Sequence, residues 1–219
     1  MVSEADREAE AAIAALLRAE RPDDGLVGEE GSDETGASGR RWVVDPLDGT
    51  TNYLYRFPAW AVSVALEDEQ GGLVGVVHDP LAGETFRAAR GGGADLNGDA
   101  IRVRDQDRLD TALIATGFGY DPDIRAGQAE LLRSIVPKVR DIRRAGAAAL
   151  DLCFVAAGRL DGYYERGINH WDYAAGALIV REAGGHVLPL EGGRFGLAAA
   201  GPRLAGALAE LAREGKAES

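Results

Sequence analysis

The sequence Asp45-Pro46-Leu47-Asp48-Gly49-Thr50-Thr51-Asn52 follows directly on the apolar run Trp42-Val43-Val44. An apolar run of this kind predicts a buried strand, and the Asp-Pro bond is expected to end it. Two carboxylates, those of Asp45 and Asp48, therefore stand at the end of a rigid element that can hold them together. Two like charges that close repel each other unless a cation lies between them, so the arrangement indicates a metal site.

The residues that follow Asp48 are suited to binding an anion. Gly49 allows the backbone to approach a ligand closely, and the N–H groups after it can bind an anion. Carboxylates for a divalent cation beside amides for an anion predict a site for a metal-bound phosphate. An ordinary turn is the alternative, because Asp-Pro and Asp-Gly pairs are common turn formers. The length of the motif, and matching acids on both sides of it, favour the metal site.

Length and composition are those of an ordinary globular protein. The chain has 219 residues, of which 46% are hydrophobic, and this is enough for one sizeable domain or two small ones that share a core. No apolar run approaches the ~20 residues of a membrane span, and we expect no signal peptide because segment 1–10 is acidic. The single cysteine, Cys153, fits a reducing cytoplasm and is expected in the core rather than as a nucleophile.

The net charge of −12 restricts the possible partners. Such a surface repels nucleic acid and anionic membranes, so neither is expected to bind. It also repels a phosphorylated substrate unless bound cations reverse the local field. The charge therefore agrees with metal-mediated phosphate binding, although acidic surfaces also serve solubility alone.

Periodicity predicts helices and strands in mixed order. Helices are expected at 3–20 (with Ser3 as N-cap), 123–136, 146–157, 172–183 and 202–213, and strands at 60–67, 73–78, 84–90, 111–116, 160–165, 186–189 and 196–200. Residues 31–40 are expected to form a surface loop and 91–93 a turn, and the tail from Glu214 is expected to fray. Because several hairpins interrupt the helices, we expect mixed or antiparallel sheets packed in layers with helices.

Further acidic residues lie on either side of the opening motif. Glu29 and Glu30 follow a short apolar segment, and Asp172 opens a predicted helix. An acid at a helix N-terminus ordinarily caps the helix and meets the positive end of its dipole. Asp172 can also do both, because one carboxylate oxygen can cap the helix while the other binds a metal.

Three motifs together resemble the inositol monophosphatase family: Gly28-Glu29-Glu30, the octapeptide 45–52, and Trp171-Asp172-Tyr173-Ala174-Ala175-Gly176. Further matches keep the family's order over roughly residues 2–201, among them Val2-Ser3-Glu4-Ala5-Asp6, Gly146-Ala147-Ala148-Ala149 and Tyr163-Tyr164-Glu165-Arg166-Gly167. The resemblance implies an α/β (α+β) layered sandwich of the order α-β-α-β-α with mixed or antiparallel sheets. It also implies one domain over residues 1–219, with sub-layers of about 1–115 and 116–219.

The resemblance further implies a Mg²⁺-dependent phosphomonoesterase with two metal ions and a weaker third. The first Mg²⁺ would be held by Glu29, Asp45 and the backbone carbonyl of Leu47, and the second by Asp45, Asp48 and Asp172. The implied substrate-binding residues are Asp48, Gly49, Thr50, Gly146, Ala148, Glu165 and Asp172, with the amides of Gly49 and Thr50 on the phosphate and Glu165 on hydroxyls of the polyol. The implied catalytic residues are Glu29, Thr50 and Asp6, of which Thr50 and Asp6 orient the attacking water and Asp6 also lies near the third metal.

Elementary chemistry supports this reading independently. A phosphate monoester is a poor electrophile, because its negative charge repels nucleophiles. Mg²⁺ held by oxygen ligands neutralises that charge, positions the ester and lowers the pKa of a water molecule. No serine or cysteine nucleophile is required.

Two features depart from the family pattern. Met1 lies only five residues before Asp6, where family members carry a further N-terminal helix, so we expect an exposed apolar patch and a less firmly held Asp6. The connection from Glu29 to Asp45 is also short, which is expected to alter the loop over the site.

Several functions are compatible with these observations. The leading hypothesis is hydrolysis of inositol monophosphate or a related polyol or sugar phosphate. Within the same fold, the alternatives are phosphatases for histidinol phosphate, fructose 1,6-bisphosphate and 3′-phosphoadenosine 5′-phosphate. A bisphosphate would require Arg or Lys near the polyol; Arg143 and Arg144 are candidates, whereas Arg166 is expected to point away.

A hypothesis of another class is a truncated, catalytically impaired homologue that only binds metal. The family resemblance also implies a homodimer, and it makes inhibition by lithium plausible.

Overall fold

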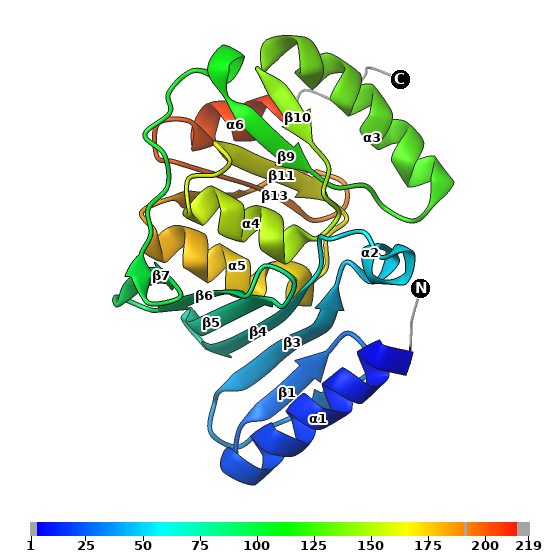
Figure 1. Cartoon of the computed structure of the whole chain (residues 1–219), viewed down its shortest axis with the longest axis vertical. Helices are drawn as coiled ribbons and strands as arrows, with labels where there is room; N and C mark the ends of the chain where they lie inside the picture. The colour runs from blue at the N-terminus through cyan, green and yellow to red at the C-terminus, as the bar shows by residue number, and fades with distance from the viewer. Residues whose placement is uncertain (1–3, 191, 214–219) are drawn as a thin grey trace.

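Two β-sheets alternate with layers of helices in the structure, a computed structural model that describes residues 4–190 and 192–213 (Figure 1). The larger sheet is formed by β1 (Gly25–Gly28), β2 (Asp33–Glu34), β3 (Arg41–Asp48), β4 (Ala61–Asp68), β5 (Gly71–Asp79), β6 (Glu84–Ala89), β7 (Gly93–Leu96) and β8 (Asp99–Ala100). Its strands lie in the order β2-β1-β3-β4-β5-β6-β7-β8. The smaller sheet is formed by β9 (Leu113–Thr116), β10 (Asp141–Arg143), β11 (Gly162–Arg166), β12 (His186–Pro189) and β13 (Gly196–Ala200), in the order β10-β9-β11-β13-β12.

The helices cover both sheets and fill the space between them. They are α1 (Glu4–Glu20), α2 (Thr50–Tyr55), α3 (Pro122–Ile135), α4 (Ala148–Ala156), α5 (His170–Glu182) and α6 (Ala205–Leu211), with 3₁₀ turns at Leu109–Thr111 and Val136–Lys138. Figure 1 shows α1 outside the larger sheet, α4 and α5 between the sheets, and α3 and α6 beyond the smaller sheet. This order confirms the α-β-α-β-α fold that the resemblance implied.

The larger sheet is mainly a series of antiparallel hairpins. From β3 to β8, each strand pairs antiparallel with the next. The exception is β1, which lies parallel to β3. In β4 the burial alternates along most of the strand, as expected for side chains that point in turn to opposite faces. The sheet is therefore mixed, and its one parallel pair lies beside the motif 45–52.

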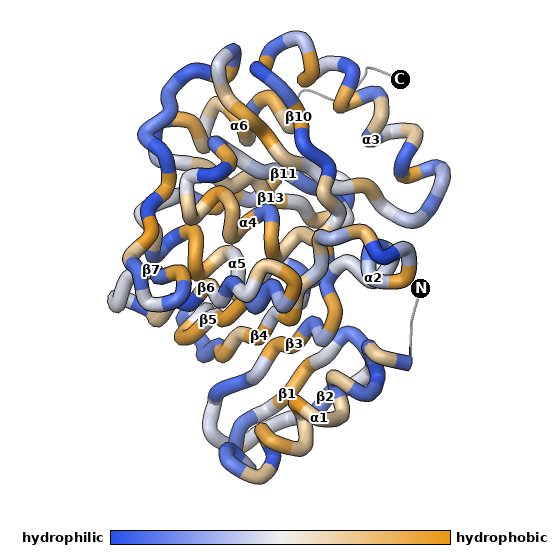
Figure 2. The backbone as a smooth tube through the Cα atoms, viewed as in Figure 1, coloured by the Kyte–Doolittle hydropathy of each residue, from blue (hydrophilic) through white to orange (hydrophobic). Residues whose placement is uncertain are grey.

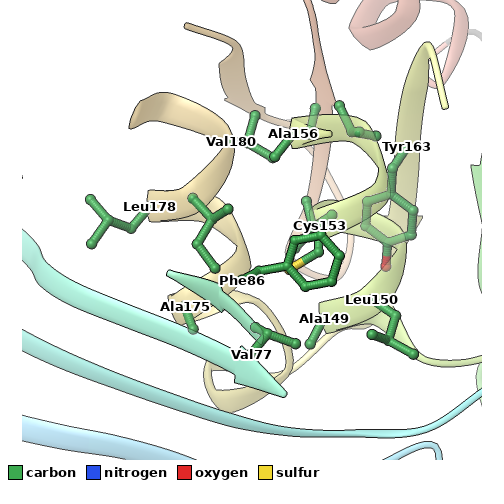
Figure 3. Close-up of a cluster of buried hydrophobic side chains, with 14 of the residues drawn as sticks. Val77, Phe86, Ala149, Leu150, Cys153, Ala156, Tyr163, Ala175, Leu178 and Val180 are labelled. Carbon is green, nitrogen blue, oxygen red and sulfur yellow. The ribbon is translucent and has the colours of Figure 1, made fainter. Parts of the chain in front are cut away.

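The middle layer buries an apolar core between the two sheets (Figure 3). Val77 and Phe86 enter it from the larger sheet, Leu150 and Cys153 from α4, and Tyr163 from the smaller sheet. Cys153 is fully buried, which confirms its expected core position. Because both faces of α4 are covered, this helix is apolar all round rather than amphipathic.

The outer helices each cover one face of a sheet. Ala14 of α1 packs with Leu26 and Val44 against the larger sheet. Leu131 and Ile135 of α3 belong to a separate cluster on the outer face of the smaller sheet, together with α6. Figure 2 shows hydrophilic and hydrophobic turns alternating along α1 and α3, as expected for helices with one face in solvent. None of the helices described is long and apolar enough to span a bilayer.

The predicted elements differ from the observed ones at a few places. The short helix α2 was not predicted, because six residues are too few for a helical period to show. β2, within the expected loop 31–40, and β10 were missed because each is a short strand at a sheet edge without apolar alternation. The expected N-cap Ser3 and the expected frayed tail from Glu214 lie outside the described residues.

Candidate active site

Parallel pairing of β1 with β3 brings Glu29 beside Asp45. Gly28 is in register with Val44, and the N–H of Glu29 donates to the carbonyl of Val44 at 3.2 Å. One residue further along both strands, Glu29 and Asp45 reach the same cavity. The sequence separates them by sixteen positions, so only the pairing of the strands places them together.

A β-bulge brings the carboxylates of Asp45 and Asp48 into the same cavity. Asp45 is opposite Ser63 on β4 and Asp48 is opposite Ala61, so three steps on β3 match two on its partner. In a regular strand, residues three apart point to opposite faces, whereas one extra residue restores a common face. Both side chains consequently line one cavity. The expectation that the strand ends at the Asp45-Pro46 bond was wrong, because β3 continues through the bulge to Asp48.

The turn after Asp48 requires glycine. Gly49 has φ 93°, in the left-handed region, and it precedes the first residue of α2. A Cβ at this position would lie 2.9 Å from the carbonyl oxygen of Ala59. Gly49 and Thr50 both line the cavity, at the N-terminal end of α2.

The N-terminus of α4 meets Asp48. The N–H of Ala149 donates to Asp48 Oδ2 at 2.6 Å, so this carboxylate binds an amide in the first turn of α4. Gly146 and Ala148, at the start of the same helix, line the cavity as expected. The contact fixes one oxygen of Asp48 and ties the larger sheet to the middle layer.

The N-terminus of α5 carries Asp172, although not as the residue that begins the helix. The helix begins at His170 with Asn169 as N-cap, and Asp172 is the third residue of a capping box. The N–H of Asn169 donates to Asp172 Oδ2 at 2.7 Å. The predicted start at Asp172 was therefore two residues late, because the Asn-x-x-Asp signature was not recognised.

Glu165 reaches the cavity from the smaller sheet. It lies on β11, and the hydroxyl of Tyr163 donates to its Oε2 at 2.6 Å. A side chain at Gly117 would clash with the Glu165 carboxylate, so the glycine leaves the space that this group occupies. The expected polyol-binding acid is thus held on the opposite side of the cavity from β3.

These groups line a cavity of about 330 Å³ between the two sheets. It brings together the sequence-predicted residues Glu29, Asp45, Leu47, Asp48, Gly49, Thr50, Gly146, Ala148, Glu165 and Asp172. Asp6 is buried and lies behind the cavity lining, where its Oδ1 accepts a hydrogen bond of 3.1 Å from the Thr50 hydroxyl. The same hydroxyl lies 3.2 Å from the carbonyl oxygen of Leu47.

Burial and mutual repulsion raise the pKa values of the central carboxyl groups. Burial raises the pKa of Asp45 well above its usual range, and the charges of Asp48, Glu29 and Asp172 raise it further. Burial and the charge of Asp172 act in the same way on the pKa of Asp48. Desolvation within the cavity raises the pKa of Glu29 to about 7 and that of Asp172 to about 6.

The donor set fits a hard divalent cation. Asp45, Asp48 and Asp172 each accept a backbone N–H through one carboxylate oxygen, from Leu47, Ala149 and Asn169 respectively. Carboxylate oxygens and a backbone carbonyl are the kind of ligand that Mg²⁺ accepts, and a cation would relieve the repulsion between the acids. Among the residues described, no three acidic, His or Cys side chains form a ready-made coordination cluster, so the fit lies in the chemistry of the donors.

Three residues with roles around the site were not recognised in the sequence. Glu10 of α1 is 5% exposed and accepts the N–H groups of Glu30 and Ser32 at 2.8 and 3.0 Å, which fixes the turn after Glu29. Asn52 donates to the carbonyl of Ala59 at 2.6 Å and to that of Ala145 at 2.9 Å, which joins α2 to the segment before α4. Arg194 lines the cavity from the connection between β12 and β13. Nothing local in the sequence distinguishes Glu10 and Arg194 from ordinary surface groups, whereas Asn52 belongs to the motif 45–52 but had no role assigned to it.

Comparisons with known proteins agree with the geometry. Residues 1–217 match the model of the Inositol monophosphatase family. The Inositol-1-monophosphatase of Rhizobium meliloti (strain 1021) is 49% identical over 195 residues, which are 88% of this chain and 73% of that protein. A relative from Haemophilus influenzae, named Nus factor SuhB, is 42% identical over 194 residues, 88% of this chain and 73% of that protein. The solved structure of the extragenic suppressor protein suhB from Bartonella henselae has a TM-score of 0.91 at 42% identity, and covers 98% of this chain and 85% of that one.

Proposed function

The chain belongs to the inositol monophosphatase family, and on that premise we propose that it is a Mg²⁺-dependent phosphomonoesterase. Its substrate is inositol monophosphate or a related polyol or sugar phosphate, which it hydrolyses to the alcohol and inorganic phosphate. Family membership and the names of the relatives support a phosphatase; the metal and the substrate are our proposal. A homodimer in a reducing cytoplasm remains part of it, and the single buried cysteine is compatible with that compartment.

The observation that carries the proposal is the charge distribution of the cavity. Six acidic residues line it together with the first residues of α2 and α4, and four of them, Glu29, Asp45, Asp48 and Asp172, are the proposed metal ligands. Acidic groups alone would repel a phosphate, and helix N-termini alone would need no carboxylates. Both occur together where a cation and a phosphate bind in contact.

Each side chain has a proposed task. Glu29, Asp45 and the Leu47 carbonyl would hold one Mg²⁺, and Asp45, Asp48 and Asp172 a second. When bound, Mg²⁺ neutralises the charge of the phosphate and makes water a stronger nucleophile at neutral pH. The amides of Gly49 and Thr50 would orient the phosphate.

The remaining residues act on the water and the polyol. The Thr50 hydroxyl donates to Asp6, so its oxygen is oriented to accept a hydrogen bond from the attacking water. Glu29 would hold the same water from the opposite strand. Glu165, anchored by Tyr163, would accept hydroxyl groups of the polyol. No side-chain nucleophile takes part: the oxygen of water bonds to phosphorus, the P–O bond to the polyol breaks, and the polyol leaves as the alcohol with a proton that comes from the water.

The experiment that tests the proposal measures phosphate release from inositol 1-phosphate with and without Mg²⁺. We expect release that depends on Mg²⁺ and that Asp48→Asn abolishes. Asp99→Asn, an exposed acid on β8 far along the larger sheet, serves as the matched control and should retain full activity. Histidinol phosphate, fructose 1,6-bisphosphate and 3′-phosphoadenosine 5′-phosphate, assayed side by side, rank the alternatives.

A folded protein that binds Mg²⁺ in a calorimetric titration but releases phosphate from none of these esters would contradict the proposal. It would support the non-catalytic hypothesis instead. The name of the Haemophilus influenzae relative is not that of an enzyme, so turnover is the property to measure first.

A further inference from the structure

Three arginines, Arg143, Arg144 and Arg166, were considered in the sequence as partners for a second phosphate, and the structure places them in different surroundings. Arg143 forms an ion pair with Asp141 at 2.6 Å and is absent from the cavity lining. Arg166 donates to the carbonyl of Gly192 at 2.7 Å and lines a different, more apolar pocket beside α3. Arg144 alone of the three lines the cavity that holds the carboxylates.

Arg144 is placed in the cavity by its neighbours. Its guanidinium carbon lies 5.8 Å from the centroid of the Phe118 ring, a cation–π contact that orients the group. A side chain at Gly146 would clash with the guanidinium, so the glycine that begins this segment leaves space for it. Burial raises the pKa of Glu165, and the Tyr163 hydrogen bond and the charge of Arg144 partly offset this rise, so Arg144 lies near Glu165 in the cavity.

Arg194 approaches the same side from another element. It lies in the connection between β12 and β13 and lines the cavity together with Arg144. Its Cδ would be 3.7 Å from a Cβ at Gly167, which places the side chain against the end of β11. Two cationic groups from different segments thus face the same cavity.

Neither guanidinium is paired with a carboxylate in the described part of the chain. Arg144 and Arg194 form no ion pair with any residue described, although Arg87, Arg90 and Arg159 elsewhere in the protein each pair with a carboxylate. Glu165 does not form an ion pair with Arg144. Its Oε2 accepts a hydrogen bond from the Tyr163 hydroxyl, and it forms no ion pair within the described chain. Two guanidinium groups without a directly paired carboxylate can bind a ligand that brings its own negative charge.

We propose that Arg144 and Arg194 form a second anion subsite, which selects phosphate esters that carry a further phosphate on the far side of the polyol or sugar ring. The inference rests on the proposed function, because the scissile phosphate occupies the carboxylate end of the cavity. A planar guanidinium binds phosphate through two parallel N–H···O hydrogen bonds. The second phosphate is bound and not transferred, so no bond is made or broken at this subsite.

The test compares two substrates that share the scissile ester and differ only at the far end. Glucose 1-phosphate carries a hydroxyl at C6, and glucose 1,6-bisphosphate carries a phosphate there. Release of the C1 phosphate is followed with Mg²⁺ for the wild type, Arg144→Gln, Arg144→Lys, Arg194→Gln and the double variant. Arg143→Gln is the matched control, since it removes an adjacent arginine that lies outside the cavity.

We expect the wild type to have a kcat/KM for the bisphosphate roughly tenfold above that for the monophosphate, as one charge-assisted bidentate contact provides. Arg144→Gln should remove most of this preference and the double variant all of it, while Arg144→Lys retains part. The change should lie in KM rather than kcat, because the subsite is remote from the reacting phosphate. Arg143→Gln should leave the ratio unchanged, and unaltered melting temperatures would exclude misfolding.

A wild type that hydrolyses glucose 1-phosphate but does not favour the bisphosphate would overturn this inference alone. The same holds if the double variant keeps the wild-type ratio. Failure to release phosphate from both glucose esters and from inositol 1-phosphate would contradict the proposed function as well.

Discussion

Glu10 shows how a residue outside the cavity controls one inside it. Its carboxylate accepts two backbone N–H groups in the turn after β1, and this turn carries Glu29. The contact crosses from α1 to the larger sheet, so α1 has a structural role in the site besides covering the sheet. Because Glu10 is buried and does not line the cavity, its effect on a cation is indirect.

Replacement of Glu10 by Ala should weaken Mg²⁺ binding and lower kcat/KM by about 10- to 100-fold, the range found for groups that orient metal ligands. Glu10→Gln should lose less, because one oxygen remains to accept an N–H. Titration calorimetry with Mg²⁺ reads the binding directly, apart from activity. Glu8→Ala, an exposed acid on the same helix, is the control, and equal losses in both Ala variants would contradict the role of Glu10.

The raised pKa values of the cavity acids predict how stability depends on pH. The pKa of Glu29 rises from 4.5 to about 7 and that of Asp172 from 3.8 to about 6. The folded protein therefore binds protons that the unfolded chain has already released. In metal-free protein, the stability that these groups contribute is present below pH ~4 and is lost as the pH rises through about 6 to 7.

We therefore expect the melting temperature of EDTA-treated protein to fall between pH 5 and pH 8. Glu29→Gln should flatten this dependence, because the amide does not ionise. Mg²⁺ should reverse the trend, since it competes with protons for the same carboxylates. Thermal melts at constant ionic strength provide the measurement, and a melting temperature that rises with pH in EDTA would contradict the expectation.

Among the elements, the turn from β3 into α2 is the most constrained by sequence. Gly49 combines a left-handed backbone with a close approach to the Ala59 carbonyl, while Asn52 ties α2 to the segment before α4. The turn therefore sets where the Gly49 and Thr50 amides lie relative to Asp48. Its backbone geometry, rather than any one side chain, is expected to position the phosphate.

Gly49→Ala should destabilise the protein by about 1–3 kcal/mol, from the left-handed conformation and the contact with Ala59. It should also reduce phosphate release more than tenfold, because the amides move. Gly98→Ala is a matched control, since Gly98 has φ 95° but no atom within 4 Å of the added Cβ. Urea denaturation and phosphate assays separate the two variants, and equal destabilisation would show that the Ala59 contact contributes nothing.

At the scale of the whole molecule, the charge of −12 and the carboxylates between the sheets act against the fold when no cation is present. The cavity lies where both sheets and the helix starts of the middle layer meet. A cation bound there stabilises contacts between all of them. Metal removal should consequently lower global stability, not only activity.

Mg²⁺ at about 100 times its Kd should stabilise the fold by about 2.7 kcal/mol, which corresponds to roughly 5–10 °C in melting temperature for a chain of this size. Asp48→Asn should lose this increase and should melt no lower than the wild type in EDTA, because one buried charge is removed. Asp99→Asn should behave as the wild type. Calorimetric melts with MgCl₂ or EDTA test this, and an Mg²⁺-independent wild type would contradict it.

The predicted homodimer stays a prediction. Two apolar elements, β4 and α4, are buried in the core and leave no apolar face for an interface there: β4 contributes Ala61 and Ala65 to the core, and α4 lies between the sheets. Sedimentation equilibrium at several protein concentrations would establish the oligomeric state.

The sequence by itself determined the chemistry of the site and the order of the elements. Asp45, Asp48, Gly49 and Thr50 lie within six residues, so a site for a cation and a phosphate could be predicted from this local motif. Long helices such as α1 and α3 were predictable because an amphipathic period of 3.6 residues recurs over several turns. Short or edge elements, such as α2 and β10, carry too few residues for any period and were missed.

Only the tertiary structure decided which distant residues share the cavity. Glu29 reaches Asp45 through parallel strand pairing, and a β-bulge turns Asp45 and Asp48 to one side. Whether an arginine meets the cavity or a carboxylate on the surface depends on loop paths and rotamers, as Arg143 and Arg144 show. The local sequence specifies which chemical groups are present, because secondary-structure propensity and motifs act over a few residues. Which of these groups meet in the cavity depends on contacts between distant segments, and no local pattern contains that information.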